Sequence, residues 1–320
     1  MSESLVDILM ATYNGERFVA EQIESIQRQT YGDWRLLVSD DCSSDRTLDV
    51  VRRYAADDSR ICIVSEGVKH GGAKENFFAL MTYSDAPYCM FCDQDDVWLP
   101  GKIEKSLAAL RSLEAEHGTG MPLLAFCDMR VVDERLGVIH ESFECYENLD
   151  PNRTQFPQVL AQAIGAGCTF LMNHALLTLS NRHHDLSAID MHDWWVTLVA
   201  AAFGRIAFVD EPLSLYRQHG DNEVGASGFS PIAWVGSIGA MTSRECSIAE
   251  QAGCFLDTFI VEMDTDQKIS CACLAGSVGP DKATNVLRLF TSGGWKVGSR
   301  KLGQILASVR GGGYSCRGQL

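Results

Sequence analysis

The first hundred residues alternate between short apolar runs and amphipathic stretches. The apolar runs have the length of buried strands, and the stretches between them repeat apolar residues every three to four positions, as a helix with one buried face does. The runs are residues 5–10, 34–38, 61–64 and 88–91, and the helical stretches are 16–29, 45–54, 74–82 and 100–116. This alternation predicts the α/β class, with a mostly parallel sheet.

Beyond residue 116 the pattern continues less regularly to about residue 224. It includes a run at 123–126 with a partner strand at Val131-Val132, a segment of small residues at 165–172, a helix that opens at 190–195, and a run at 206–209. After residue 224 the sequence becomes Gly- and Ser-rich and weakly helical. We therefore expect one domain over residues 1–224 and a C-terminal extension over residues 225–320.

Polar residues gather where the expected strands end. Tyr13 and Asn14 follow the first strand, Asp40 and Asp41 follow the second, and Asp93 and Asp95 follow the fourth. Because parallel strands joined by helices place their carboxyl ends at one edge of the sheet, we expect these three strand ends to face one crevice.

The segment after the fourth strand, CDQDDVW, contains three aspartates within four positions. Carboxylates this close repel one another unless a cation or hydrogen-bond donors compensate them. Asp93 and Asp95 form a D-x-D pair, and such oxygen ligands favour Mg²⁺ or Mn²⁺. An EF-hand loop is excluded, because its sixth position would be Trp98 where glycine is needed. The alternative is a cluster that only caps the helix beginning near Pro100.

Composition narrows the class of function. The formal net charge of −15 argues against a nucleic-acid partner, which would require a basic surface. Twelve cysteines, and a start that carries Glu3 and Asp7 where a signal peptide would be basic and then apolar, favour free thiols in the cytoplasm. The nearest candidate for a membrane span, Val224–Ser243, is broken by glycines and a proline, so we expect no transmembrane helix.

Six ordered motifs together resemble family 2 glycosyltransferases, and most closely bacterial rhamnosyltransferases of cell-wall and surface polysaccharide synthesis. They are MATYNGE at 10–16, VSDDCSSDRT at 38–47, CDQDDVWLPGKIE at 92–104, GAGCTFLMN at 165–173, MHDWW at 191–195 and YRQHGDN at 216–222. The resemblance implies a GT-A fold, Rossmann-like with a mixed, mostly parallel sheet, followed here by a helical extension. The nucleotide-sugar-binding half would span about residues 1–133 and the acceptor half about 134–224.

The resemblance also implies roles for residues at the strand ends. Tyr13 would lie against the nucleotide base, Asp41 would accept the imide N–H of that base, and Asp93 would approach the ribose. Asp95 would hold Mg²⁺ or Mn²⁺, with Asp93 and His219 as further metal ligands. The other expected nucleotide-sugar contacts are Thr12, Asn14, Glu16, Asp40 and Arg217, although Asp40 could instead support the loop.

Inversion at the anomeric carbon requires a base opposite the leaving group. Asp193 is the candidate, because a carboxylate at the start of a helix is favoured by the helix dipole. Trp194 and Trp195 beside it are expected to pack on the acceptor sugar. The alternative for this segment is a capped helix with aromatic core anchors.

The expected reaction is the transfer of L-rhamnose from dTDP-L-rhamnose to a lipid-linked saccharide. A UDP-hexose donor and a non-catalytic sugar-nucleotide-binding protein are the alternatives. Residues 282–320 contain seven basic residues and no acid, so they are expected either to contact anionic lipid on the cytosolic face of the plasma membrane or to pack on the catalytic domain. The apolar side of this segment would consist of Trp295, Leu302, Ile305 and Leu306.

Overall fold

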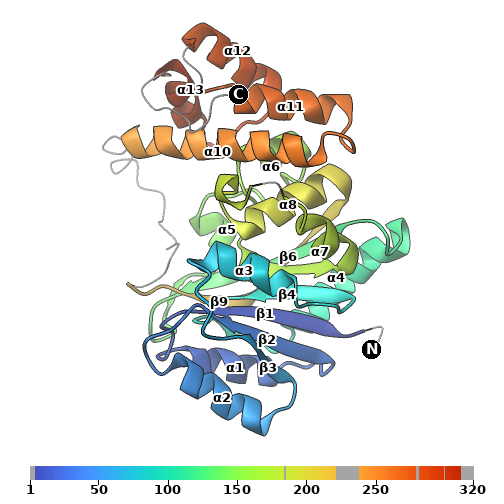
Figure 1. Ribbon diagram of the computed structural model, residues 1–320, viewed down its shortest axis with the longest axis vertical. Coiled ribbons are helices and arrows are strands. Elements are labelled where there is room, and N and C mark those ends of the chain that lie inside the picture. The colour runs from blue at the N-terminus through green and yellow to red at the C-terminus, as the bar shows by residue number, and fades with distance from the viewer. Residues whose placement is uncertain (1–3, 184, 221–237, 279–280, 299, 311–320) are drawn as a thin grey trace. The chain divides into compact units, whose positions relative to one another are not determined.

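The computed structural model describes residues 4–183, 185–220, 238–278, 281–298 and 300–310 (Figure 1). The chain forms two compact units: residues 1–147, 165–181 and 203–227, and residues 148–164, 182–202 and 228–320. This grouping differs from a single boundary near residue 224, since two segments of the expected acceptor half pack with the C-terminal helices. The division by function stays a prediction.

One mixed sheet forms the centre of the first unit. Its strands are β1 (Val6–Thr12), β2 (Trp34–Asp40), β3 (Ile61–Ser65), β4 (Tyr88–Cys92), β5 (Val97–Trp98), β6 (Leu123–Val132), β7 (Val138–His140), β8 (Phe170–Asn173) and β9 (Arg205–Arg217). The strand order is β3-β2-β1-β4-β8-β6-β9-β5, with β7 beside β6. Parallel pairing joins β3, β2, β1 and β4 and also joins β6 to β9.

Helices cover both faces of the parallel strands, because successive strand residues point to opposite faces. α1 (Val19–Gln27), α2 (Thr47–Asp57) and α4 (Lys102–His117) pack in one core with Val6, Ile8 and Met10. α3 (Ala73–Met81) contacts β1 and β2 and places Phe77 5.2 Å from Phe91. In Figure 1, α1 and α2 lie on one side of β1 and β2, and α3 lies on the other. The same unit also contains the helices α5 (Phe143–Tyr146) and α7 (His174–Ser180).

The elements predicted for the first hundred residues are confirmed, with boundaries that move by about three residues at most. One later prediction is wrong. Val131-Val132 is not a partner strand but the end of β6, whose register shifts near Asp128, and β7 is its partner. The run at 206–209 is confirmed as strand, and it forms the start of β9, which pairs along the whole of β6.

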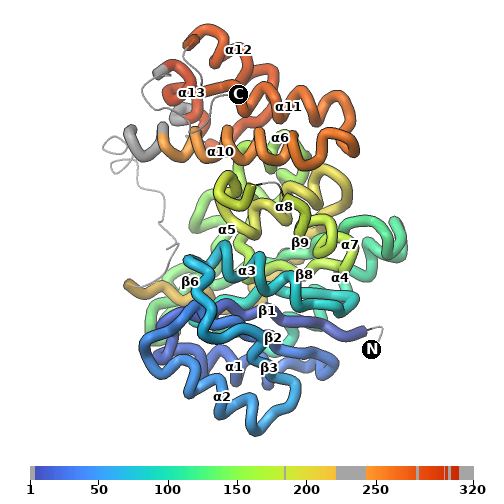
Figure 2. The backbone as a smooth tube through the Cα atoms, viewed as in Figure 1, coloured from blue at the N-terminus to red at the C-terminus, as the bar shows by residue number. Residues whose placement is uncertain are grey.

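The second unit is helical. Its helices are α6 (Phe156–Ala161), α8 (His192–Phe203), α10 (Ile238–Phe259), α11 (Thr265–Ala275), α12 (Lys282–Ser292) and α13 (Arg300–Arg310). α10 packs against α11 and α13 (Figure 2). None of the helices described is both long and apolar enough to cross a membrane. Most of Val224–Ser243 lies outside the described residues.

Candidate functional site

The carboxyl ends of β1, β2 and β4 lie at one edge of the sheet. Thr12, the last residue of β1, is in register with Asp40, the last residue of β2. Met10, two residues earlier on β1, is in register with Cys92, the last residue of β4. The loops that carry most of the predicted site residues therefore start from neighbouring points, as the strand pattern predicted.

Hydrogen bonds join the loop after β1 to the loop after β2. The backbone N–H groups of Asn14 and Gly15 donate to Ser43 Oγ at 2.9 Å and to Thr47 Oγ1 at 2.7 Å. Asn14 Oδ1 accepts from the Ser44 backbone N–H at 2.8 Å. Asn14 has a φ of +48°, in the left-handed region that asparagine tolerates better than most residues. The Asn14 side chain thus holds the loop in shape.

Two predicted nucleotide contacts are buried and bonded within these loops. Thr12 Oγ1 donates to Asp40 Oδ1 at 2.9 Å, and the Asp40 carboxylate also accepts from the backbone N–H and hydroxyl of Ser43. These bonds favour the alternative that Asp40 supports the loop, and contacts of Thr12 and Asp40 with a nucleotide sugar stay predictions. Glu16 is partly exposed and accepts from the Arg46 backbone N–H at 3.0 Å, so its contact with a nucleotide sugar stays a prediction.

Tyr13 and Asp41 are the predicted contacts for the nucleotide base. The Tyr13 residue is 57% exposed, so its ring is open to a ligand. The Asp41 carboxylate accepts from the backbone N–H groups of His70, Gly71 and Gly72, immediately before α3. A base at Tyr13 would share the Asp41 carboxylate with this loop, and both contacts stay predictions.

Gln94, which lies between Asp93 and Asp95, holds the loop after β4 against the loop after β1. Its amide accepts from the Tyr13 backbone N–H at 3.0 Å and donates to the Tyr13 carbonyl at 2.9 Å. A Cβ atom at Gly15 would lie 2.1 Å from Gln94 Oε1, so a larger residue here would displace the Gln94 amide from this position. Sequence analysis missed Gln94 because an amide between two aspartates carries no chemistry of its own.

The structure brings together two of the predicted metal ligands. His219 Nε2 lies 2.7 Å from Asp95 Oδ2, and both side chains are largely buried. Carboxylate oxygen and imidazole nitrogen are both ligands that Mn²⁺ and related divalent cations accept in proteins. The donor set at this point therefore fits a divalent cation.

A second group lies beside the first. Ligand atoms of Asp93, Asp96 and Cys168 all lie within 4.8 Å of one another. Burial raises the pKa of the Cys168 thiol well above its usual range, which disfavours the thiolate as a ligand. Mg²⁺ and Mn²⁺ prefer oxygen, so Asp93 remains the ligand that this group offers to them.

Asp96 and Lys102 are buried charged residues that the sequence analysis did not single out. Burial, followed by the charge of Asp95, raises the pKa of Asp96 to about 7. Asp96 Oδ1 accepts from the Arg217 backbone N–H at 3.1 Å, and Oδ2 has no hydrogen-bond partner among the described residues. Lys102 Nζ donates to the Cys168 carbonyl at 2.6 Å, and its charge acts to lower the pKa of Asp96. A lysine in the first turn of a helix normally indicates an exposed position, so no sequence signal marked it.

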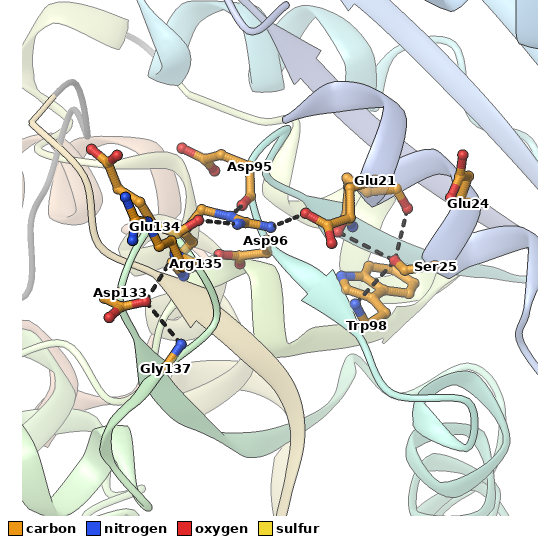
Figure 3. A network of polar contacts seen from close by, with 12 residues as sticks. Glu21, Glu24, Ser25, Asp95, Asp96, Trp98, Asp133, Glu134, Arg135 and Gly137 are labelled. Carbon is orange, nitrogen blue, oxygen red and sulfur yellow. Dashed lines mark hydrogen bonds and ion pairs between the residues drawn. The ribbon is translucent and has the colours of Figure 1, made fainter. Parts of the chain in front are cut away.

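Arg217, a predicted contact of the nucleotide sugar, is the last residue of β9. Its side chain is 2% exposed. Nε donates to the Asp95 carbonyl at 2.8 Å, Nη1 donates to the Glu134 carbonyl at 2.7 Å, and Nη2 donates to the Glu21 carboxylate. Figure 3 shows Glu21, Asp95 and Glu134 around this point. The guanidinium is bonded to acceptors inside the protein, and its contact with the nucleotide sugar stays a prediction.

The predicted base and its neighbours begin α8 in the second unit. Asp193 is partly exposed, and its Oδ1 accepts from the Trp194 backbone N–H at 2.7 Å. Trp194 is buried and donates from Nε1 to the Val159 carbonyl at 2.7 Å. Trp195 is fully buried, and the centroid of its ring lies 5.2 Å from that of Phe255. Both tryptophans pack in the core, which favours the alternative of aromatic core anchors over contact with an acceptor sugar. The role of Asp193 stays a prediction.

Comparisons with known proteins decide the family. The sequence model described as glycosyl transferase family 2 matches residues 7–128. The dTDP-rhamnosyl transferase RfbG of Shigella flexneri is 30% identical over 230 residues, which cover 68% of this chain and 74% of that protein. The chain belongs to glycosyl transferase family 2.

Two further proteins resemble this family 2 glycosyltransferase. The UDP-Glc:alpha-D-GlcNAc-diphosphoundecaprenol beta-1,3-glucosyltransferase WfgD of Escherichia coli is 36% identical over 110 residues, which cover 34% of this chain and 42% of that protein. The mannosyltransferase PcManGT of Pyrobaculum calidifontis, solved with GDP-Man and Mn²⁺, has a TM-score of 0.53 at 14% identity and covers 95% and 86% of the two chains. That structural likeness, together with family membership, confirms the expected GT-A fold.

Glu144 on α5 is a buried carboxyl group that no sequence pattern marked. Neither of its oxygens has a hydrogen-bond partner among the described residues. Burial, followed by the charges of Asp128 and Glu147, raises the pKa of Glu144 to about 8. Glu144 lies next to the small-residue segment, since a Cβ atom at Gly165 would be 3.5 Å from its Oε1. The group is therefore mostly protonated at neutral pH.

This protonation predicts a pH dependence of stability. The unfolded chain releases the Glu144 proton near pH 4.5 and the folded chain near pH 8, so the contribution of this group falls as pH rises between those values. The slope is at most about 1.4 kcal/mol per pH unit. Urea unfolding at pH 5 and pH 8 should show that Glu144→Gln gains stability relative to wild type as pH rises. The exposed Glu116→Gln is the control, and parallel pH profiles for wild type and Glu144→Gln would contradict the prediction.

Proposed function

We propose that this family 2 glycosyltransferase transfers L-rhamnose from dTDP-L-rhamnose to a hydroxyl group of a lipid-linked saccharide, with inversion and with a divalent cation. The observation that carries the proposal is the 2.7 Å contact of Asp95 with His219 beside the ends of three parallel strands. The likeness to RfbG supports the donor. The diphosphoundecaprenol-linked substrate in the name of WfgD supports a lipid-linked acceptor.

Asp95, His219 and Asp93 would hold Mg²⁺ or Mn²⁺. When bound, such an ion offsets the negative charge of the departing diphosphate. The Mn²⁺ in the mannosyltransferase PcManGT supports this class of cation. An added positive charge would also relieve the mutual repulsion of the aspartates after β4.

Asp193 would act as the base. The acceptor oxygen forms a bond to the anomeric carbon, the bond from that carbon to the diphosphate oxygen breaks, and the hydroxyl proton passes to Asp193. Asp193 lies in the first turn of α8, where a carboxylate interacts favourably with the helix dipole. Burial lowers the pKa of the adjacent His192 to about 4, so its imidazole ring is uncharged at neutral pH. The Asp193 carboxylate therefore has no charged imidazole next to it in the sequence.

Thermal-shift measurements test the donor and the metal together. Wild-type protein should be stabilised by dTDP-L-rhamnose with Mn²⁺, and by much less when either is omitted or when Asp95 is replaced by Asn. Asp85→Asn, an exposed acid just before β4, is the matched control and should respond as wild type does. Greater stabilisation by UDP-glucose would favour a UDP-hexose as the donor. A wild-type thermal shift in Asp95→Asn would show that Asp95 is not a metal ligand.

A second variant tests the base. Asp193→Asn should keep the thermal shift with donor and Mn²⁺, because the substitution leaves the donor site intact. The rate of sugar transfer, measured from the release of dTDP, should fall about 100-fold or more, which is the usual contribution of a general base. Transfer at the wild-type rate in Asp193→Asn would show that another group takes the proton.

α12 supports contact with a membrane surface. Leu287 and Phe290, 67% and 59% exposed, are three residues apart and so share a face of the helix, while Leu289 is buried. Lys282 and Arg288 are exposed on the same helix. Exposed apolar residues flanked by basic ones suit an anionic lipid surface.

The rest of the basic segment supports this contact less evenly. Lys296 is buried and forms an ion pair with Glu245, so it is not available to lipid. Of the predicted apolar residues, Leu306 is exposed, Trp295 and Ile305 are partly buried, and the side chain of Leu302 lies outside the described part of the structure. The lipid contact would therefore centre on α12.

Vesicle co-sedimentation tests this surface. The protein should bind vesicles of phosphatidylcholine with a quarter phosphatidylglycerol, and Leu287→Gln with Phe290→Gln should weaken binding about tenfold or more, since each apolar side chain contributes on the order of 1.5 kcal/mol. The matched control is Ile260→Gln with Val261→Gln, exposed apolar residues in the turn that follows α10. Equal binding of the two double variants to the vesicles would contradict a lipid contact at α12.

A further inference from the structure

The inference begins with the buried guanidinium of Arg217 at the end of β9. Its Nη2 forms an ion pair with Glu21, which lies on α1 and is 43% exposed. The Phe18 ring, one turn before Glu21, lies 4.7 Å from the guanidinium carbon. A buried charge is stable only when it is paired and its donors are satisfied, so α1 supplies what Arg217 needs at this position.

The same residue holds the backbone that carries Asp95. Arg217 Nε donates to the Asp95 carbonyl at 2.8 Å, and the Arg217 backbone N–H donates to the next side chain, Asp96, at 3.1 Å. The segment 95–96 is thus fixed at two points by one arginine. Figure 3 shows Asp95 and Asp96 on one side of this network and Glu21 on the other.

His219 is held by the same elements. It follows Arg217 by two residues, its ring lies 4.8 Å from Phe18, and its Nε2 lies 2.7 Å from Asp95 Oδ2. The first turns of α1 therefore contact both Arg217 and His219, through Glu21 and Phe18. A shift of Arg217 would move the Asp95 backbone and the strand end that carries His219 together.

A turn at residues 133–137 completes the support. Asp133 Oδ1 accepts from the backbone N–H groups of Arg135 and Gly137 at 2.8 Å each, which holds the turn closed. The turn presents the Glu134 carbonyl to Arg217 Nη1 at 2.7 Å. The guanidinium is therefore fixed from three separate parts of the fold.

We propose that Glu21 and Arg217 are positioning residues that set the distance between Asp95 and His219 and so set the affinity of the enzyme for its divalent cation. Neither residue touches the cation. The inference rests on the proposed metal site and deepens it, because it assigns that site a support on α1. Support of this kind matters because removing a group that orients a metal ligand typically weakens binding on the order of 10-fold to 100-fold.

The test is Mn²⁺ affinity, measured from the electron paramagnetic resonance signal of free Mn²⁺ with dTDP present. Glu21→Gln should raise the Kd for Mn²⁺ by about 10-fold, because the amide keeps the size of the side chain but loses its charge. Activity should recover at saturating Mn²⁺, so that the KM for Mn²⁺ rises while kcat changes little. Arg217→Lys, which cannot reach the same acceptors at once, should show a larger rise in Kd.

Glu24→Gln is the matched control. Glu24 lies on the same helix with a side-chain exposure of 47%, and it pairs with Arg28 instead. Figure 3 shows it away from Asp95. Its Kd for Mn²⁺ should stay within twofold of wild type.

Two outcomes separate this inference from the function it rests on. If wild type binds Mn²⁺ and Glu21→Gln binds it equally well, the positioning role is overturned and the metal site stands. If wild type transfers sugar in chelator and binds no Mn²⁺, the metal site and its positioning residues are both overturned. A loss of kcat in Glu21→Gln with an unchanged Kd would assign Glu21 a structural role only.

Discussion

The compensation of negative charge after β4 is the constraint on which the first unit depends. Asp93, Asp95 and Asp96 lie within four residues, and Asp96 is fully buried. Two buried cations, Lys102 from α4 and Arg217 from β9, lie near this segment. Uncompensated charge in a protein interior costs several kcal/mol, so these elements must meet for the chain to fold. A bound cation would offset negative charge that these residues leave uncompensated, since the pKa of Asp96 stays raised to about 7.

The sheet topology makes this meeting possible. Parallel pairing puts the ends of β1, β2 and β4 at one edge. The long pairing of β6 with β9 brings Arg217 and His219, more than a hundred residues further along the chain, to the same edge. Short β5, directly after the aspartates, pairs with β9 and fixes the register between them. A site built from segments more than a hundred residues apart thus rests on strand pairing, which is stiffer than loop contact.

Burial explains why several polar residues support the site without facing a ligand. Asp40 accepts hydrogen bonds within its own loop, and the Arg217 guanidinium is bonded to protein acceptors. Trp194 and Trp195 anchor the core of the second unit. Such residues are typical of binding motifs because an exposed residue can contact a ligand accurately only when the residues behind it are fixed.

The sequence by itself determined the α/β alternation and the strand ends at which the polar residues gather, because these follow from local periodicity. Asp95 and His219 became candidate ligands through the resemblance of their motifs to the family. The sequence could not show which of Asp40 and Asp41 is bonded within its own loop. It also could not show that the Arg217 guanidinium is bonded inside the protein, or that Glu21 pairs with it and is not simply an exposed glutamate on a helix. Those distinctions depend on which side chains become buried and which distant acceptors they meet. Tertiary structure alone decided them, because the cost of burying a charge or a polar group depends on partners that are remote in the chain.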